Sequence, residues 1–329
     1  MRVFTDGAEF GDSLFWTVFP SWTVSNLLPR SGVYSYRNAL SSAVVITKTI
    51  AALSEFYWKG VYNYPLATAR LFAWYNGGTE QGSVRLNAST GCLSLYTGTG
   101  TLVASGTIPF PINAHVMLEV HVKIADAAGV IETKLDAVSD VSFSGDTKPG
   151  TATDVDVIGV AAAGAGTGAP AYLDDIALNN ITGGVDDGWC GDGKVALQMP
   201  DSAGDVTGLS PSAGSNWECV NELPHNTDTD YVQDTVVDDY DLYNLLPCGL
   251  SGVTIQRVWA ESRARDTVAA GGLCQVGLKT VATEYWSGDL SLLTTYTPKI
   301  GVDHTVNPNT LAAWTTDQLD ALQVGFKVR

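Results

Sequence analysis

The chain has 329 residues, of which 45% are hydrophobic and 16% charged, and its formal net charge at pH 7 is −17. Phosphate backbones and anionic lipids repel such an acidic chain, so the composition argues against nucleic acid or a membrane as a partner. The length suits two domains, and the sequence holds no apolar run of about 18 residues that could span a bilayer.

The start of the chain and its cysteines predict synthesis in a cytoplasm. Asp6, Glu9 and Asp12 lie where a signal peptide would carry its apolar core. The cysteines are odd in number and widely spaced, unlike a disulfide framework or a zinc knuckle. We therefore expect free, buried thiols at Cys92, Cys190, Cys219, Cys248 and Cys274.

Strand signals dominate the first half of the chain. In residues 116–124 an apolar side chain stands at every second position, with Glu119 and His121 among the polar residues between them. Similar runs cover residues 83–88, 92–98, 101–106 and 130–136. Turn residues separate these runs at intervals of roughly 8–12 residues, as in antiparallel β-sandwiches. The sequence predicts an all-β protein with two antiparallel β-sandwich domains of the jelly-roll type.

A Gly-rich stretch at residues 181–188 marks the expected domain boundary. After it, residues 186–244 hold 13 acidic residues and a single basic one, Lys194. We predict a first domain at 1–183, a linker at 184–188 and a second domain at 189–329. The sequence leaves open whether 186–244 belongs to the second sandwich or forms a separate arm.

The second half repeats the strand pattern and adds one short helix. Strands are expected at 253–262, 274–282 and 323–328. A helix is expected at 316–321, where Thr315 and Gln318 fit a capping box. Trp314 and Leu319 would then reach the core.

Catalytic signatures are weak. The sequence has no G-x-S-x-G motif, and its four histidines stand apart from any recognisable nucleophile. Glycoside hydrolysis needs two facing carboxyl groups, but Glu132 and Asp136 are separated by Lys134 on the same strand face, as in a solvated charge ladder. The sequence therefore predicts that the chain is not an enzyme.

Two acidic clusters could hold Ca²⁺. Asn226, Asp228 and Asp230 have the spacing of the first EF-hand ligands, but that loop lacks its Gly and its final Glu. A looser site could use Asp228, Asp230 and Asp234, or instead Asp238, Asp239 and Asp241. Asp174 and Asp175 form the second cluster, and the competing interpretation is a strand-end turn in which an Asp binds backbone amides. No other cofactor is expected.

The aromatic residues offer candidate contact sites. A cluster within 57–75 lies beside the polar loop 76–82, and a second group follows at 231–243. Such residues pack in cores, form protein interfaces or stack on sugars. The candidate interface residues are Tyr57, Trp58, Tyr62, Tyr64, Trp74, Tyr75, Tyr231, Tyr240 and Tyr243.

Short motifs add two resemblances. The order of elements in 1–183, closing with Y-L-D-D-I-A-L at 172–178, resembles a concanavalin A-like or laminin-G-like jelly roll. In the second half, G-W-C-G-D-G-K-V (188–195) and G-S-N-W-E-C-V-N-E-L-P (214–224) are similar to virion proteins of tailed bacteriophages. The second resemblance implies a structural component of the capsid or tail.

The resemblance also implies partners and a location. Such a protein would be made in the host cytoplasm, reside in the virion, bind other capsid or tail proteins and assemble as a homo-oligomer. The alternative is a lectin-like module that binds host surface glycans through the first domain.

Overall fold

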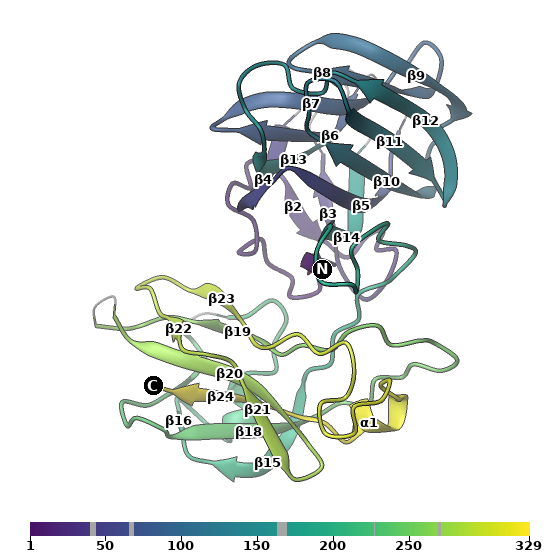
Figure 1. The fold of residues 1–329 in the computed structure, drawn as a ribbon. Coiled ribbons are helices and arrows are strands. Elements are labelled where there is room, and N and C mark those ends of the chain that lie inside the picture. Colours follow the sequence, from purple (N-terminus) through teal and green to yellow (C-terminus); the bar gives the residue numbers. More distant parts are fainter. Residues whose placement is uncertain (40–43, 66–68, 163–169, 227, 269–270) are drawn as a thin grey trace. The chain divides into compact units, whose positions relative to one another are not determined.

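The computed structural model describes residues 1–39, 44–65, 69–162, 170–226, 228–268 and 271–329, and the chain divides into two compact units, Met1–Ala196 and Leu197–Arg329. Most of the regular structure is antiparallel β-sheet (Figure 1), which confirms the all-β prediction. The described helices are too short and too polar to cross a lipid bilayer.

The first unit is a sandwich of two antiparallel sheets. The eight-stranded sheet has the order β12-β11-β10-β5-β14-β3-β2, with β1 paired to β14. Its strands are β1 (Arg2–Asp6), β2 (Thr23–Ser25), β3 (Ser35–Asn38), β5 (Glu55–Asn63), β10 (His115–Lys123), β11 (Gly129–Leu135), β12 (Val138–Gly145) and β14 (Ala171–Asn180). The six-stranded sheet has the order β4-β13-β6-β7-β8-β9. Its strands are β4 (Val44–Leu53), β6 (Ala69–Asn76), β7 (Thr79–Leu86), β8 (Cys92–Thr97), β9 (Thr101–Pro109) and β13 (Val155–Ala162).

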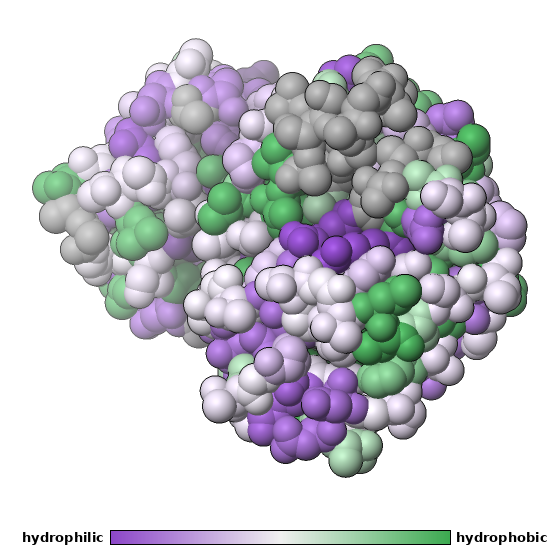
Figure 2. Space-filling view, turned by 90° about the horizontal axis from the view of Figure 1, so that it is seen from above, coloured by the Kyte–Doolittle hydropathy of each residue, from purple (hydrophilic) through white to green (hydrophobic). Residues whose placement is uncertain are grey.

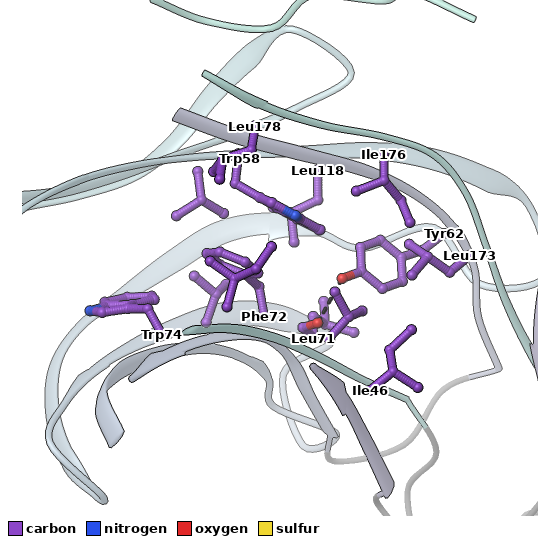
Figure 3. Close-up of a cluster of buried hydrophobic side chains, with 14 of the residues drawn as sticks. Ile46, Trp58, Tyr62, Leu71, Phe72, Trp74, Leu118, Leu173, Ile176 and Leu178 are labelled. Carbon is purple, nitrogen blue, oxygen red and sulfur yellow. Dashed lines mark hydrogen bonds between the residues drawn. The ribbon is translucent and has the colours of Figure 1, made fainter. Parts of the chain in front are cut away.

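The core between the two sheets follows from the alternation of side chains along the strands. Val120 on β10 pairs with Trp58 on β5, and both side chains are fully buried. Figure 3 shows the Trp58 ring against Phe72 of the opposite sheet, and their ring centroids lie 4.2 Å apart in a stacked arrangement. The Tyr62 hydroxyl donates to the carbonyl of Leu71 at 2.6 Å.

This core corrects part of the expected aromatic interface. Trp58, Tyr62, Tyr64 and Trp74 have no exposed surface and belong to the core cluster. Their apolar rings stabilise the sandwich, so the prediction of surface contacts is wrong for these four residues. Aromatic density in the sequence does not reveal the side of the strand on which each ring lies.

The first unit extends beyond the expected domain end at residue 183. We call residues 189–195 the strap, because they lie on the outer face of the eight-stranded sheet. The strap amide of Gly191 donates to Glu119 at 2.8 Å, and that of Val195 donates to Asp175 at 2.8 Å. Lys59, which is buried, donates to the carbonyl of Gly193. These contacts place the strap in the first unit rather than in the second domain.

The second unit contains a six-stranded sheet of order β15-β18-β24-β20-β21, with β22 paired to β20. Its strands are β15 (Pro200–Thr207), β18 (Tyr240–Leu245), β20 (Leu273–Thr280), β21 (Thr283–Trp286), β22 (Leu290–Ser291) and β24 (Gln323–Val328). Two small sheets pair β16 (Ser210–Pro211) with β17 (Val232–Gln233), and β19 (Glu261–Ala264) with β23 (Thr297–Ile300). The acidic segment 186–244 is divided between the units, since β15 and β18 are strands of this sheet.

The described part of the second unit also has two short helices: η1 (Asn216–Cys219) and α1 (Thr316–Asp320). The predicted capping box of α1 is present, with Thr315 and Gln318 bonded reciprocally. Trp314 and Leu319 lie in the core with Leu245, Leu278 and Leu322, as predicted.

The strand expected at 253–262 is largely absent. Within this segment Ile255 and Val258 form only isolated bridges, to Trp314 and His304, before β19 begins at Glu261. Its apolar side chains pack at the edge of the core while most of its backbone pairs with no strand. The cysteines agree with expectation: all five are free, and only Cys248 is less than fully buried.

Candidate functional site

The outer face of the six-stranded sheet carries a row of polar side chains over small residues. Phe72, Val84 and Leu95 lie opposite one another on β6, β7 and β8 and point into the core. The adjacent set, Ala73, Ser83 and Tyr96, therefore points outward. Ala73 and Ser83 have no exposed surface, so neighbouring longer side chains shield the floor of this face.

Two arginines and one glutamate form the centre of this face. The Glu80 carboxylate lies 2.9 Å from Arg70 Nη2 through one oxygen and 3.1 Å from Arg85 Nη2 through the other. The side chain of Glu80 is 6% exposed, whereas those of Arg70 and Arg85 are 29% and 22% exposed. We call these three residues the Arg–Glu–Arg row. Its carboxylate is buried and its guanidinium groups are open to solvent.

Irregular strand pairing brings the row together. The register between β6 and β7 shifts between Arg70 and Phe72, and again between Trp74 and Tyr75. Bulges of this kind re-aim side chains, so that Arg70 faces Arg85 and Tyr75 faces Glu80 on one side of the sheet. A regular period of two would not predict this grouping.

Two tyrosines border the row. The Arg85 guanidinium lies over the ring of Tyr96 at 4.2 Å. Tyr75 lies across Gly159 on β13, where an added Cβ would meet the Tyr75 ring at 2.9 Å. A tyrosine hydroxyl is neutral at pH 7, and burial raises the pKa of Tyr75 further, so this hydroxyl can donate or accept a hydrogen bond.

The row has unused hydrogen-bonding capacity. Arg85 donates through Nε to Ser83 at 2.9 Å and through Nη2 to the carbonyl of Thr99 at 2.9 Å. The Nε atom of Arg70 has no hydrogen-bond partner among the described residues but is itself buried, so a ligand on this face would meet the Nη atoms of Arg70 instead. Two guanidinium groups and one carboxylate give the row a net positive charge within a strongly acidic chain. Such a set can donate paired hydrogen bonds to hydroxyl or carboxylate oxygens.

The opposite sheet has a pocket of about 190 Å³ beside the strap, with Val61 and Met117 among its lining residues. Its polar groups already have partners. Arg30 is paired with Asp175 and Asp192, and the Asp136 carboxylate accepts the amide of Met117 at 2.8 Å. We therefore place the candidate site on the six-stranded sheet.

The remaining candidate aromatics are dispersed. Tyr57 stacks on His121 at 4.2 Å and meets Trp189 of the strap, on the outer face of the eight-stranded sheet. Tyr75 is the one member that lies beside the Arg–Glu–Arg row. Tyr231, Tyr240 and Tyr243 belong to the second unit, where the Tyr243 hydroxyl is buried and donates to Asp241.

The acidic clusters have other partners. Asp228 pairs with Arg265, Asp230 accepts from Ser212, and Asp234 accepts amides of its own turn. Within the described ranges, no three His, Cys, Asp or Glu side chains are grouped as a metal site would require.

The alternative interpretation of Asp174 and Asp175 is confirmed for the bonds to backbone amides but not for a strand-end turn, because both residues lie within β14 where its register with β5 shifts. Asp174 accepts the amide of Arg30 at 2.7 Å, and Asp175 accepts the amide of Val195 at 2.8 Å. Burial, and then the neighbouring charge of Asp175, raise the pKa of Asp174 to about 8. The pair holds loops against β14.

Sequence reasoning missed Arg70, Glu80, Arg85 and Tyr96. The one sequence feature that pointed to any of these four residues was the alternation within residues 83–88, which places Arg85 on the same strand face as Ser83. Figure 2 shows that hydrophilic and hydrophobic side chains on the visible surface gather in several small patches, separated by residues of intermediate hydropathy.

Comparisons with known proteins give structural similarity only. No protein-family model matches the chain, and no curated protein matches its sequence. An endo-β-1,4-glucuronan lyase from Trichoderma reesei is 11% identical and covers 54% of this chain and 95% of its own, with a TM-score of 0.41. A Trypanosoma rangeli sialidase is 10% identical over 48% of this chain and 26% of its own, with a TM-score of 0.33. A galectin from Caenorhabditis elegans is 13% identical over 43% of this chain and 93% of its own, with a TM-score of 0.31.

These findings correct the expected role in a phage particle. The similar structures just named are a polysaccharide lyase, a sialidase and a galectin, and the prediction of a structural virion protein is wrong. The two motifs behind that prediction form different structures: residues 188–195 include the strap of the first unit, and residues 214–224 include η1 of the second.

Proposed function

We propose that the first unit binds carbohydrate through the Arg–Glu–Arg row. The observation that carries this proposal is the Glu80 carboxylate held between two partly exposed arginine side chains on an outward sheet face. Adjacent hydroxyl groups of a sugar match the paired donors of a guanidinium group. Tyr75 and Tyr96 supply aromatic surface beside these donors, the usual combination in a site that orients a small polar ligand.

The proposed activity is binding without cleavage. Glu80 is the single carboxylate of the row, and each of its oxygens is paired with an arginine. Hydrolysis of a glycosidic bond commonly requires a second carboxyl group about 5–9.5 Å away as acid, base or nucleophile. Glu80 therefore serves to orient the two guanidinium groups.

The test is binding of the full chain to a panel of alginate, glucuronan, laminarin and β-galactoside oligosaccharides. We expect at least one ligand to bind, and Arg85→Met to weaken that binding by about tenfold or more, because a hydrogen bond to a charged group contributes about 1.5–3 kcal/mol. Calorimetry measures the affinity. Arg70→Met, at the more exposed arginine, provides a second variant if Arg85→Met does not fold.

The matched control is Lys148→Met, which removes an exposed ion pair with Asp126 elsewhere in the same unit. It should leave affinity unchanged. Equal affinity of the wild type and both arginine variants would refute the site, and release of shorter products from the panel would refute binding without cleavage.

A further inference from the structure

A tryptophan in the second unit lies flat on a shelf formed by two glycines. Gly277 on β20 pairs with both Trp286 on β21 and Gly325 on β24. A Cβ added at Gly277 would meet Trp286 Cε3 at 2.7 Å, and one added at Gly325 would meet Cη2 at 2.7 Å. The absence of side chains at both positions allows the indole to lie against the backbone. Glycine in the middle of a strand weakens a sheet and often marks a place where another group approaches the backbone closely. The two glycines therefore suggest that the position of this indole matters for function.

The indole does not belong to the core of its unit. Leu278 and Val324 are among the apolar side chains on the core side of β20 and β24. Gly277 and Gly325 are their sequence neighbours and point to the opposite side. Trp286 is therefore on the solvent side of the sheet, where it is half-buried.

Neighbouring groups fix the ring in place. Trp286 Nε1 donates to Glu284 at 2.9 Å, and the Tyr240 hydroxyl donates to the other oxygen of that carboxylate at 3.2 Å. The Tyr240 and Trp286 rings meet edge to face, with centroids 5.4 Å apart. The Lys327 ammonium lies 4.2 Å from the Trp286 ring centroid and 4.8 Å from that of Tyr240. The aromatic surface is thus preorganised and carries a cation on a flexible stem.

The surroundings of this aromatic pair are polar. Gln275 on β20 pairs with Lys327, while Lys279 on β20 and Asn244 on β18 both pair with Gln323 on β24. These polar side chains therefore lie on the same side of the sheet as Gly325. The aliphatic Leu242 on this side is 1% exposed. A protein partner would need an apolar centre of several side chains. A flat aromatic surface bordered by amides, amines and the carboxylates of Glu284 and Asp205 instead matches a sugar ring, which has an apolar C–H face and hydroxyl groups at its edge.

We propose that Trp286, Tyr240 and Lys327 form a second carbohydrate-binding surface, which takes a pyranose ring of a polysaccharide. The sugar stacks on the indole as the Lys327 side chain moves aside to bind an edge oxygen. Gln275 and Gln323 lie on the same strand face but already donate to Asp289 and to Asp205 and Asn244, so the proposed sugar contacts are those of the indole and Lys327. This surface is separate from the Arg–Glu–Arg row and does not depend on it.

The experiment is affinity electrophoresis of the full chain in gels containing either alginate, a polyuronate, or laminarin, a neutral glucan. Trp286→Ala should abolish retardation by at least one of the two polymers in an Arg85→Met background, where the first site is disabled. Trp286→Phe keeps an aromatic ring and should retain part of the retardation. Retardation by alginate alone would show that the bound sugar is carboxylated, and retardation by laminarin would show that hydroxyl groups suffice.

The matched control is Trp259→Ala, a half-buried tryptophan of the same unit whose Nε1 donates to Glu261. It should migrate like its parent. Retardation unchanged by Trp286→Ala, or lost equally in Trp259→Ala, would overturn the proposal. Because the background already lacks Arg85, loss in Trp286→Ala supports the second surface even if the first site fails its own test.

Discussion

Glu9 is a buried acid whose protonation links pH to the stability of the first unit. It is 5% exposed, and its carboxylate accepts the amide of Val33 at 2.8 Å. Burial, outweighing the bond from Val33, raises the pKa of Glu9 to about 7. The folded unit therefore holds this proton more firmly than the unfolded chain, whose carboxyl group has the usual pKa near 4.3.

We predict that Glu9 makes the first unit less stable as pH rises. Stability from a raised carboxyl pKa is complete below the unfolded pKa and is lost as pH rises through the folded one, here between about 4.3 and 7. Glu9→Gln keeps an acceptor for the amide of Val33 but has no proton to lose. Thermal unfolding of both proteins from pH 4.5 to 8 should show a steeper fall for the wild type, and parallel curves would contradict the prediction.

Single residues also show what the sequence could reveal. Alternation placed Glu119 and His121 on the outer side of β10 correctly, because that strand pairs regularly with β5 and β11. The same rule could have separated Tyr57 from Trp58. It could not have joined Arg70 to Glu80, since two register shifts and the pairing of β6 with β7 decide that contact.

Asp175 shows how one buried carboxylate can fix two distant segments of the chain to a strand. It is 1% exposed and accepts the Arg30 guanidinium at 2.8 Å, the Ser31 hydroxyl at 2.7 Å and the strap amide of Val195 at 2.8 Å. Two segments distant in sequence are thereby fixed to β14. The sequence indicated an amide-binding turn here but could not identify the amides.

Asp175→Ala should destabilise the first unit by about 3–5 kcal/mol, the usual cost of removing one member of a buried ion pair. The comparison is Asp126→Ala, which removes an exposed ion pair with Lys148 and should cost less than about 1 kcal/mol. Urea unfolding measures both. Similar losses in the two variants would show that Asp175 is not the anchor of these loops.

At the scale of the whole molecule, the sequence predicted two β-rich units but ended the first too early. The Gly-rich stretch 181–188 looked like a linker, yet the residues after it return to the eight-stranded sheet. Trp189 packs on Tyr57 and lies under the Lys134 ammonium at 4.0 Å. Such long-range contacts are absent from local sequence signals.

A fragment of residues 1–196 should therefore be more stable than one of residues 1–183. The shorter fragment loses the strap, leaving Lys59 and Glu119 without the Gly193 carbonyl and the Gly191 amide. Several hydrogen bonds at about 1 kcal/mol each, together with the Trp189 contacts, predict a difference of roughly 3 kcal/mol. Thermal unfolding of the two fragments measures this difference in stability. Equal unfolding midpoints would support an end of the first domain at residue 183.

The central claim is that Arg70 and Arg85 contact a sugar, and their own NMR signals test it most directly. The full chain, labelled with ¹⁵N-arginine, would be titrated in turn with alginate, glucuronan, laminarin and β-galactoside oligosaccharides. We predict that the Nε–Hε signals of Arg70 and Arg85 shift together with at least one ligand, while that of Arg257, paired with Asp303 in the second unit, stays in place. Binding that moves neither signal, or no binding by any of the four, would contradict the account.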